Sequence, residues 1–149
     1  MALILRIILG LGLAIFGLSG FRVADAFRSK RLALKTSVAD TRVDDAFYRW
    51  SSAAATWSAF AFIVSGVAVG IPSPSLLATA FALLAIGAQR FGHGYELCAG
   101  IRRELKFEGY QDRAQSDEWM AGSAKMAAVA VIVIGISATA WLAITVQHL

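Results

Sequence analysis

The side chains that could do chemistry gather in one short segment. His93, Glu96 and Cys98 are the residue types that ligate a transition metal or exchange a proton. His93 and Glu96 lie three residues apart, so a helix would put them on one face, but no further ligand accompanies them beyond Cys98. The other histidine, His148, lies at the opposite end of an apolar run, which excludes a haem held by two histidines of this chain. We therefore predict no metal site, and we interpret this segment as a solvated helix end.

Cys98 is the only cysteine, which excludes a disulfide scaffold. Arg102 and Arg103 follow it, and they would lower the pKa of its thiol if the helix presents them together with it. The apolar runs contain no Asp or Glu, so a proton relay or an ion-coupled transporter has no carboxylate to work with. We expect no catalytic residues.

The elements that must position these residues are transmembrane helices. Of the 149 residues 58% are hydrophobic and 16% are charged, against about 45–50% and 25% in soluble domains. Four apolar runs, at about 2–20, 52–71, 75–91 and 124–146, each approach the ~20 residues that cross a bilayer. The sequence thus predicts an all-α polytopic membrane protein. Residues 1–149 form one membrane domain, a four-transmembrane-helix bundle with helical cytoplasmic extensions.

The charges predict the orientation. Thirteen of the fourteen Lys and Arg residues lie in the two stretches 21–50 and 89–125. These stretches contain or flank the two loops, 21–51 and 92–123, and loops rich in Lys and Arg face the cytoplasm. Both termini would then lie outside. We expect the membrane to be the bacterial inner membrane. The net charge of +4 is explained without nucleic acid. A signal peptide cleaved at Ala24-Asp25-Ala26 is the competing interpretation of the first run, and we favour an uncleaved helix.

Both loops carry helix signals. Thr41-x-x-Asp44 is a capping box, which predicts a helix running into the second span. The third helix is expected to extend as far as Phe107, with Gly109 as its C-cap. Ser116 precedes two acidic residues and is the predicted start of the fourth helix. The first run is likewise expected to continue into its loop as a helix.

Small residues line several helix faces and predict close helix packing. The predicted helix-packing positions are Gly10, Ala14 and Gly17 in the first span, and Ala54, Ser58, Ala61, Ser65, Gly66 and Gly70 in the second. Contacts within the chain are the first expectation, and contacts between subunits remain open.

The order of these parts resembles the membrane-associated proteins in eicosanoid and glutathione metabolism. Arg90-Phe-Gly-His93 at the inner end of the third span, with Arg49, stands where residues of that family stand. The resemblance covers most of the chain in topology and implies a glutathione site in which Arg90 pairs with a carboxylate. The chain has Ala54 and Trp57 where the family has Asn and Glu, which removes polar groups of the thiol-binding site.

Three functions follow as hypotheses. The first is a non-enzymatic structural or accessory subunit that packs against other membrane helices. Its partners would be the lipid bilayer and other membrane subunits or a second copy. The second is a glutathione-family-like membrane enzyme with a degenerate site, for which Arg90 and His93 are the candidate ligand-binding residues and glutathione the cofactor. The third is a small holin-like pore-former. No cofactor is predicted for the first or the third.

Overall fold

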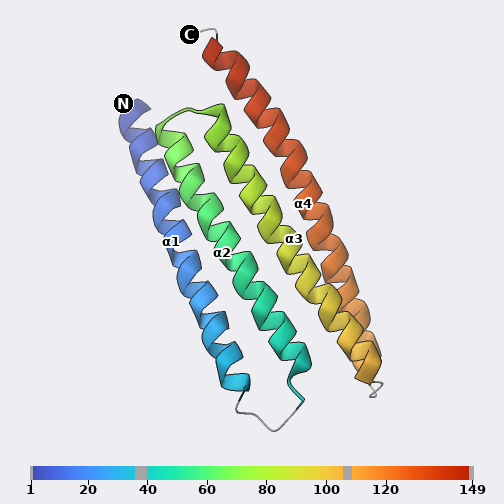
Figure 1. Ribbon diagram of the computed structural model, residues 1–149. Helices are drawn as coiled ribbons and strands as arrows, with labels where there is room; N and C mark the ends of the chain where they lie inside the picture. The colour runs from blue at the N-terminus through green and yellow to red at the C-terminus, as the bar shows by residue number, and fades with distance from the viewer. Residues whose placement is uncertain (1, 36–39, 106–108, 148–149) are drawn as a thin grey trace.

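Four long helices make up the protein (Figure 1). The computed structural model describes residues 2–35, 40–105 and 109–147. The helices are α1 (Ala2–Leu34), α2 (Arg42–Gly70), α3 (Pro74–Leu105) and α4 (Tyr110–Gln147). All four are long and apolar enough to cross a membrane, and no strand occurs in the described residues. The predicted all-α four-helix bundle is confirmed.

Each helix is longer than a bilayer requires. The helices have 29 to 38 residues, whereas about 20 residues cross the hydrocarbon core. The surplus turns lie mainly where α1 is connected to α2 and α3 to α4, and we name this the charged end. The opposite end, which we name the turn end, carries both termini and the short α2–α3 connection (Figure 1). The expected helical extensions are present, because both charged segments are largely helical.

The four helices form a single open layer. Among the described residues α1 packs on α2, α2 on α3 and α3 on α4, and no other pair of helices is in contact. Figure 1 shows the four helices side by side in chain order. A closed bundle would bring α1 against α4. Here these two helices are edges, and each buries only the side that faces its one neighbour.

Glycine lies in every seam between adjacent helices. A methyl group added at Gly17 of α1 would lie 2.8 Å from the carbonyl oxygen of Ala59 in α2. At Gly87 of α3 it would lie 2.8 Å from Ser58 Oγ in α2, and at Gly135 of α4 it would lie 2.6 Å from Cβ of a residue on α3, Phe81. Because membrane helices associate through close van der Waals contact, these glycines set how near the backbones approach.

The helix ends differ from the prediction at two places. Thr41 is the N-cap of α2, but its side chain makes no capping hydrogen bond. Asp40 Oδ1 instead accepts one from the Arg42 backbone N–H at 3.2 Å. The fourth helix begins at Tyr110, so the predicted start at Ser116 is wrong. The acidic residues after Ser116 form ion pairs with α3, and they do not mark a helix start.

The connection between α3 and α4 is partly described. Gly109 has a φ of +82°, the left-handed conformation that glycine adopts at low cost. It lies directly before α4. The predicted end of the third helix at Phe107 lies outside the described residues.

Candidate functional site

Ion pairs join the helices at the charged end. Arg102 Nε of α3 lies 2.9 Å from Asp117 Oδ2 of α4, and both side chains are largely buried. Next to it, Arg103 Nη2 lies 2.6 Å from an oxygen of Glu118. Between α1 and α2, Arg31 Nε lies 2.7 Å from an Asp45 carboxylate oxygen. These pairs fix the register of the adjacent helices where they leave the apolar region.

Two arginines and a histidine meet at the indole ring of Trp50. The guanidinium carbon of Arg49 lies 5.7 Å from the ring centroid and that of Arg90 lies 5.4 Å from it, within the range of cation–π attraction. The His93 ring packs edge-on against the same indole at 4.6 Å between centroids. The backbone at Gly94 allows this approach, because a methyl group there would lie 2.6 Å from Trp50 Cβ.

The arrangement continues from α3 to α4 through one carboxylate. Glu96 Oε2 lies 3.7 Å from His93 Nδ1 and accepts a hydrogen bond from Lys125 Nζ at 2.9 Å. The Lys125 ammonium, more than His93, holds the pKa of Glu96 below its usual value. Six residues from three helices therefore form one connected group. We name it the basic cluster: Arg49, Trp50, Arg90, His93, Glu96 and Lys125.

The basic cluster has an excess of positive charge. Arg49, Arg90 and Lys125 are cationic, and Glu96 is the one acidic member. Within the described residues no carboxylate lies within 4 Å of either Arg49 or Arg90. A guanidinium presents a planar set of donors that suits a phosphate or a carboxylate. This surface is therefore chemically suited to bind an anion.

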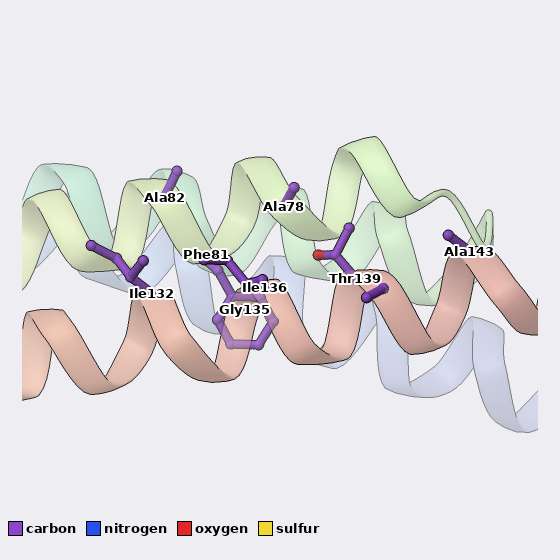
Figure 2. Close-up of a pocket in the computed structure, with 9 residues that line it drawn as sticks. Ala78, Phe81, Ala82, Ile132, Gly135, Ile136, Thr139 and Ala143 are labelled. Atoms are coloured by element: carbon purple, nitrogen blue, oxygen red, sulfur yellow. The ribbon is translucent and has the colours of Figure 1, made fainter.

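An apolar groove runs between α3 and α4 from the basic cluster toward the turn end. It consists of two hollows of about 560 Å³ and about 420 Å³, which share Ala82 and Ile132. Figure 2 shows the smaller of the two. Lys125 and Gln89 line the larger hollow, at the charged end. In the smaller hollow the hydroxyl of Thr139 is buried without a hydrogen-bond partner in the structure. We name this feature the α3–α4 groove.

Cys98 lies outside the basic cluster and is not activated. Its Sγ is buried and donates a hydrogen bond to the carbonyl oxygen of Val43 at 3.5 Å. Burial raises the pKa of the Cys98 thiol to about 11, and the Asp117 carboxylate adds to this. Arg102 acts in the opposite direction but is paired with Asp117. Arg102 thus lowers this pKa, as the sequence suggested, but burial and Asp117 have the larger effects and the net shift is upward.

The predicted helix-packing residues lie in different environments. Gly10 and Gly66 face each other across the α1–α2 seam, and Ala14 also contacts Gly66. Gly70 faces open space, with no atom within 4 Å of an added methyl group. The others lie as follows: Gly17 in the α1–α2 seam, Ala54 and Ser58 against Gly87 of α3, Ala61 buried, and Ser65 half-buried with its hydroxyl donating to the Ala61 carbonyl.

Sequence reasoning missed two parts of the site. One is Trp50, at the centre of the basic cluster, for which the only signal in the sequence is its position next to Arg49. The α3–α4 groove is lined by alanine and isoleucine on two helices, and no local pattern signals such a pairing.

The residues that carry the family resemblance are close together in space. Arg49, Arg90 and His93 surround Trp50. Ala54 is buried against α3 and supplies only a methyl group where that family has Asn. Comparisons with protein-family models, with curated proteins and with solved structures find no match for this chain.

Proposed function

We propose that this chain is a non-enzymatic membrane subunit that packs through the free side of α4 against another membrane helix. The observation that carries the proposal is a stripe of mostly small residues on this edge helix. Spacings of four and three alternate along it, which keeps its members on one helix face. The α4 stripe consists of Ser123, Ala127, Ala130, Ile134, Ser137 and Trp141, all exposed in the single chain.

The α4 stripe points away from the rest of the molecule. The side of α4 that meets α3 is marked by Ala121, Ala128 and Gly135, which are buried. Of the stripe residues, Trp141 is 68% exposed and Ile134 is 57% exposed. The stripe is thus free to contact a partner.

The other edge of the layer exposes fewer small side chains. Most exposed side chains of α1 in its apolar part are large, among them Leu3, Ile4, Ile7, Ile8, Leu11, Ile15 and Leu18. On α4 the large exposed side chains lie mostly outside the α4 stripe, for example Met126, Val129 and Val133. Lipid tails are as apolar as leucine, so such a face gains little by leaving lipid for another helix. Small side chains let a second backbone approach closely. The contrast supports a lipid-facing edge at α1 and a protein-facing edge at α4.

The orientation belongs to the same proposal. We place the charged end in the cytoplasm of a bacterial cell and the turn end, with both termini, outside the inner membrane. The distribution of lysine and arginine supports this orientation.

The test adds bulk to the α4 stripe. Ala127→Leu with Ala130→Leu raises hydrophobicity, so membrane insertion should be unchanged, but the added side chains hold a partner helix away. In mild detergent the wild type should migrate in native electrophoresis as a complex with a second copy or a copurifying protein. The double variant should migrate as the single chain.

The matched control adds the same bulk to α1. Gly12→Leu with Ser19→Leu changes two exposed small residues on the lipid-facing edge, and Gly12 has no atom within 4 Å of an added methyl group. This control should keep the complex. If it loses the complex as the α4 variant does, or if neither variant differs from wild type, the α4 stripe is not the contact. Release of vesicle-trapped dye by the purified protein would instead support the pore-former, and binding of reduced glutathione the enzyme.

A further inference from the structure

We propose that the α3–α4 groove and the basic cluster together bind one anionic phospholipid from the leaflet at the charged end. One acyl chain lies in the groove, and the phosphate lies at Lys125 and Arg90. This proposal is independent of the contact made by the α4 stripe.

The groove and the charges form one continuous surface. Lys125 lines the groove and also belongs to the basic cluster. On α3, Ile86 and Gln89 line the groove. Arg90 is four residues after Ile86, and residues at this spacing are neighbours on a helix surface. A molecule in the larger hollow therefore has the Lys125 ammonium beside its headgroup end. The Arg90 guanidinium lies over the Trp50 ring, one turn of α3 beyond the lining residue Ile86.

The dimensions suit one leaflet. Half of a hydrocarbon core of about 30 Å is about 15 Å, and a helix rises about 1.5 Å per residue. An acyl chain that starts at Lys125 therefore ends about ten residues along α4, near Gly135, where the Phe81 ring lies in the seam. Thr139, about 21 Å from Lys125 along the axis, lies beyond that end.

The shape of the groove selects a chain over a helix. Its floor is made of small side chains, Ala82, Ala85 and Ala128, between the adjacent helices α3 and α4. A transmembrane helix with its side chains is about 10 Å wide and cannot enter a slot between two helices that are in contact. An acyl chain is narrow enough to do so, and in a membrane it is also the abundant apolar molecule. Lipid therefore fills this space.

The charge selects an anionic headgroup. Arg90 and Arg49 have no carboxylate partner in the described part of the chain, and Glu96 is engaged by Lys125. A zwitterionic headgroup brings a choline cation to this positive surface, whereas phosphatidylglycerol brings only its phosphate charge. Each basic residue near an anionic lipid contributes on the order of a fivefold change in affinity.

The test is native mass spectrometry of the purified protein in mild detergent with equal amounts of phosphatidylglycerol and phosphatidylcholine. The wild type should retain one phosphatidylglycerol in preference to phosphatidylcholine. Arg90→Gln with Lys125→Gln should lower this retention about thirtyfold, since two charges are lost. The control Arg22→Gln with Lys30→Gln removes two exposed charges from α1 at the same end, and retention should change less than about twofold.

A groove-filling variant separates lipid binding from anion binding. Ala82→Phe fills the position shared by both hollows and should abolish phosphatidylglycerol retention without changing the affinity for inorganic phosphate. Gly12→Phe, on the open face of α1, is the control and should retain lipid. If Ala82→Phe melts at a lower temperature than wild type, Ile132→Trp gives the same test at the other shared position.

Several outcomes overturn the proposal. Equal retention of the two lipids by the wild type would show no headgroup selection. An equal loss of phosphatidylglycerol retention in the α1 control variants would show only a general attraction between basic side chains and anionic lipid. Retention that survives both groove-filling variants, or binding of inorganic phosphate without lipid, would leave an anion site with no acyl-chain groove.

Discussion

Burial decides the reactivity of the single cysteine. With a pKa of about 11 against an ordinary value of 9.0, Cys98 holds about one fiftieth as much thiolate at pH 9 as a free cysteine does. We expect a water-soluble maleimide to label the folded protein at pH 9 at least about fiftyfold more slowly than the SDS-unfolded protein. Mass spectrometry of timed samples measures the difference. Labelling of the folded protein at the unfolded rate would show that Cys98 is accessible and ionised.

The same pKa shift predicts how stability depends on pH. The folded state holds the Cys98 proton more tightly than the unfolded state does, so the unfolded state loses its proton first as pH rises. The contribution of Cys98 is therefore fully present below pH 9.0 and is lost as pH rises from there toward about 11. Cys98→Ser should remove this part of the pH dependence of the melting temperature.

At the scale of residues, local spacing predicted only some of the site. Arg90 and His93 were identified through the family resemblance that Arg90-Phe-Gly-His93 carries, and His93 and Glu96 through their spacing on one helix. The net upward shift of the Cys98 pKa could not be predicted, for a physical reason. It depends on burial and on Asp117, which lies on another helix. The residues next to Cys98 in the sequence indicate neither of these causes.

At the scale of helices, two glycines four residues apart on α2 give a sharp comparison. Gly66 lies against the backbone of Gly10, and a methyl group there would lie 3.0 Å from the Ala14 nitrogen, whereas Gly70 faces open space. Gly66→Leu should force α1 away and destabilise the fold by about 1–3 kcal/mol, the usual cost of overpacking. Gly70→Leu should change stability by less than about 0.5 kcal/mol, as surface substitutions do.

The measurement is the unfolding midpoint of each single variant in mild detergent. Gly70→Leu is the matched control, because the substitution, the helix and the hydrophobic gain are the same. Equal destabilisation by the two substitutions would mean that Gly70 is also packed. An unchanged midpoint for Gly66→Leu would mean that the α1–α2 seam is looser than described.

Gly66 and Gly70 also show that a spacing motif does not determine which of its residues contacts another helix. The spacing Gly66-x-x-x-Gly70 predicts close packing, but the structure directs only the Cβ position of Gly66 into the seam, whereas that of Gly70 faces open space. A pattern of small residues indicates that another helix could approach closely at these positions. It does not indicate whether another helix lies there. The start of α4 was misplaced for a similar reason, because Asp117 and Glu118 are helix-start residues in composition but are partners of α3 in space.

At the scale of the whole molecule, the number of spans was predictable and their arrangement was not. Hydropathy and length are local properties, and they predicted four apolar helices correctly. Whether four helices close into a ring or lie in one layer depends on which faces meet, and small residues occur on more than one face of each helix. The open layer is what exposes both the α4 stripe and the α3–α4 groove.

The orientation of this layer can be tested directly. In a Cys98→Ser background, Ser73→Cys places a thiol in the connection between α2 and α3, and Ser116→Cys places one on the exposed surface of α4 at the charged end. If lysine and arginine hold the charged end inside the cell, an impermeant maleimide should label only the Ser73→Cys protein in intact cells. After the cells are opened, both should be labelled, which controls for accessibility. The reverse pattern would place the basic cluster outside, and its phospholipid would then come from the outer leaflet. Labelling of both in intact cells would mean that the chain adopts two orientations.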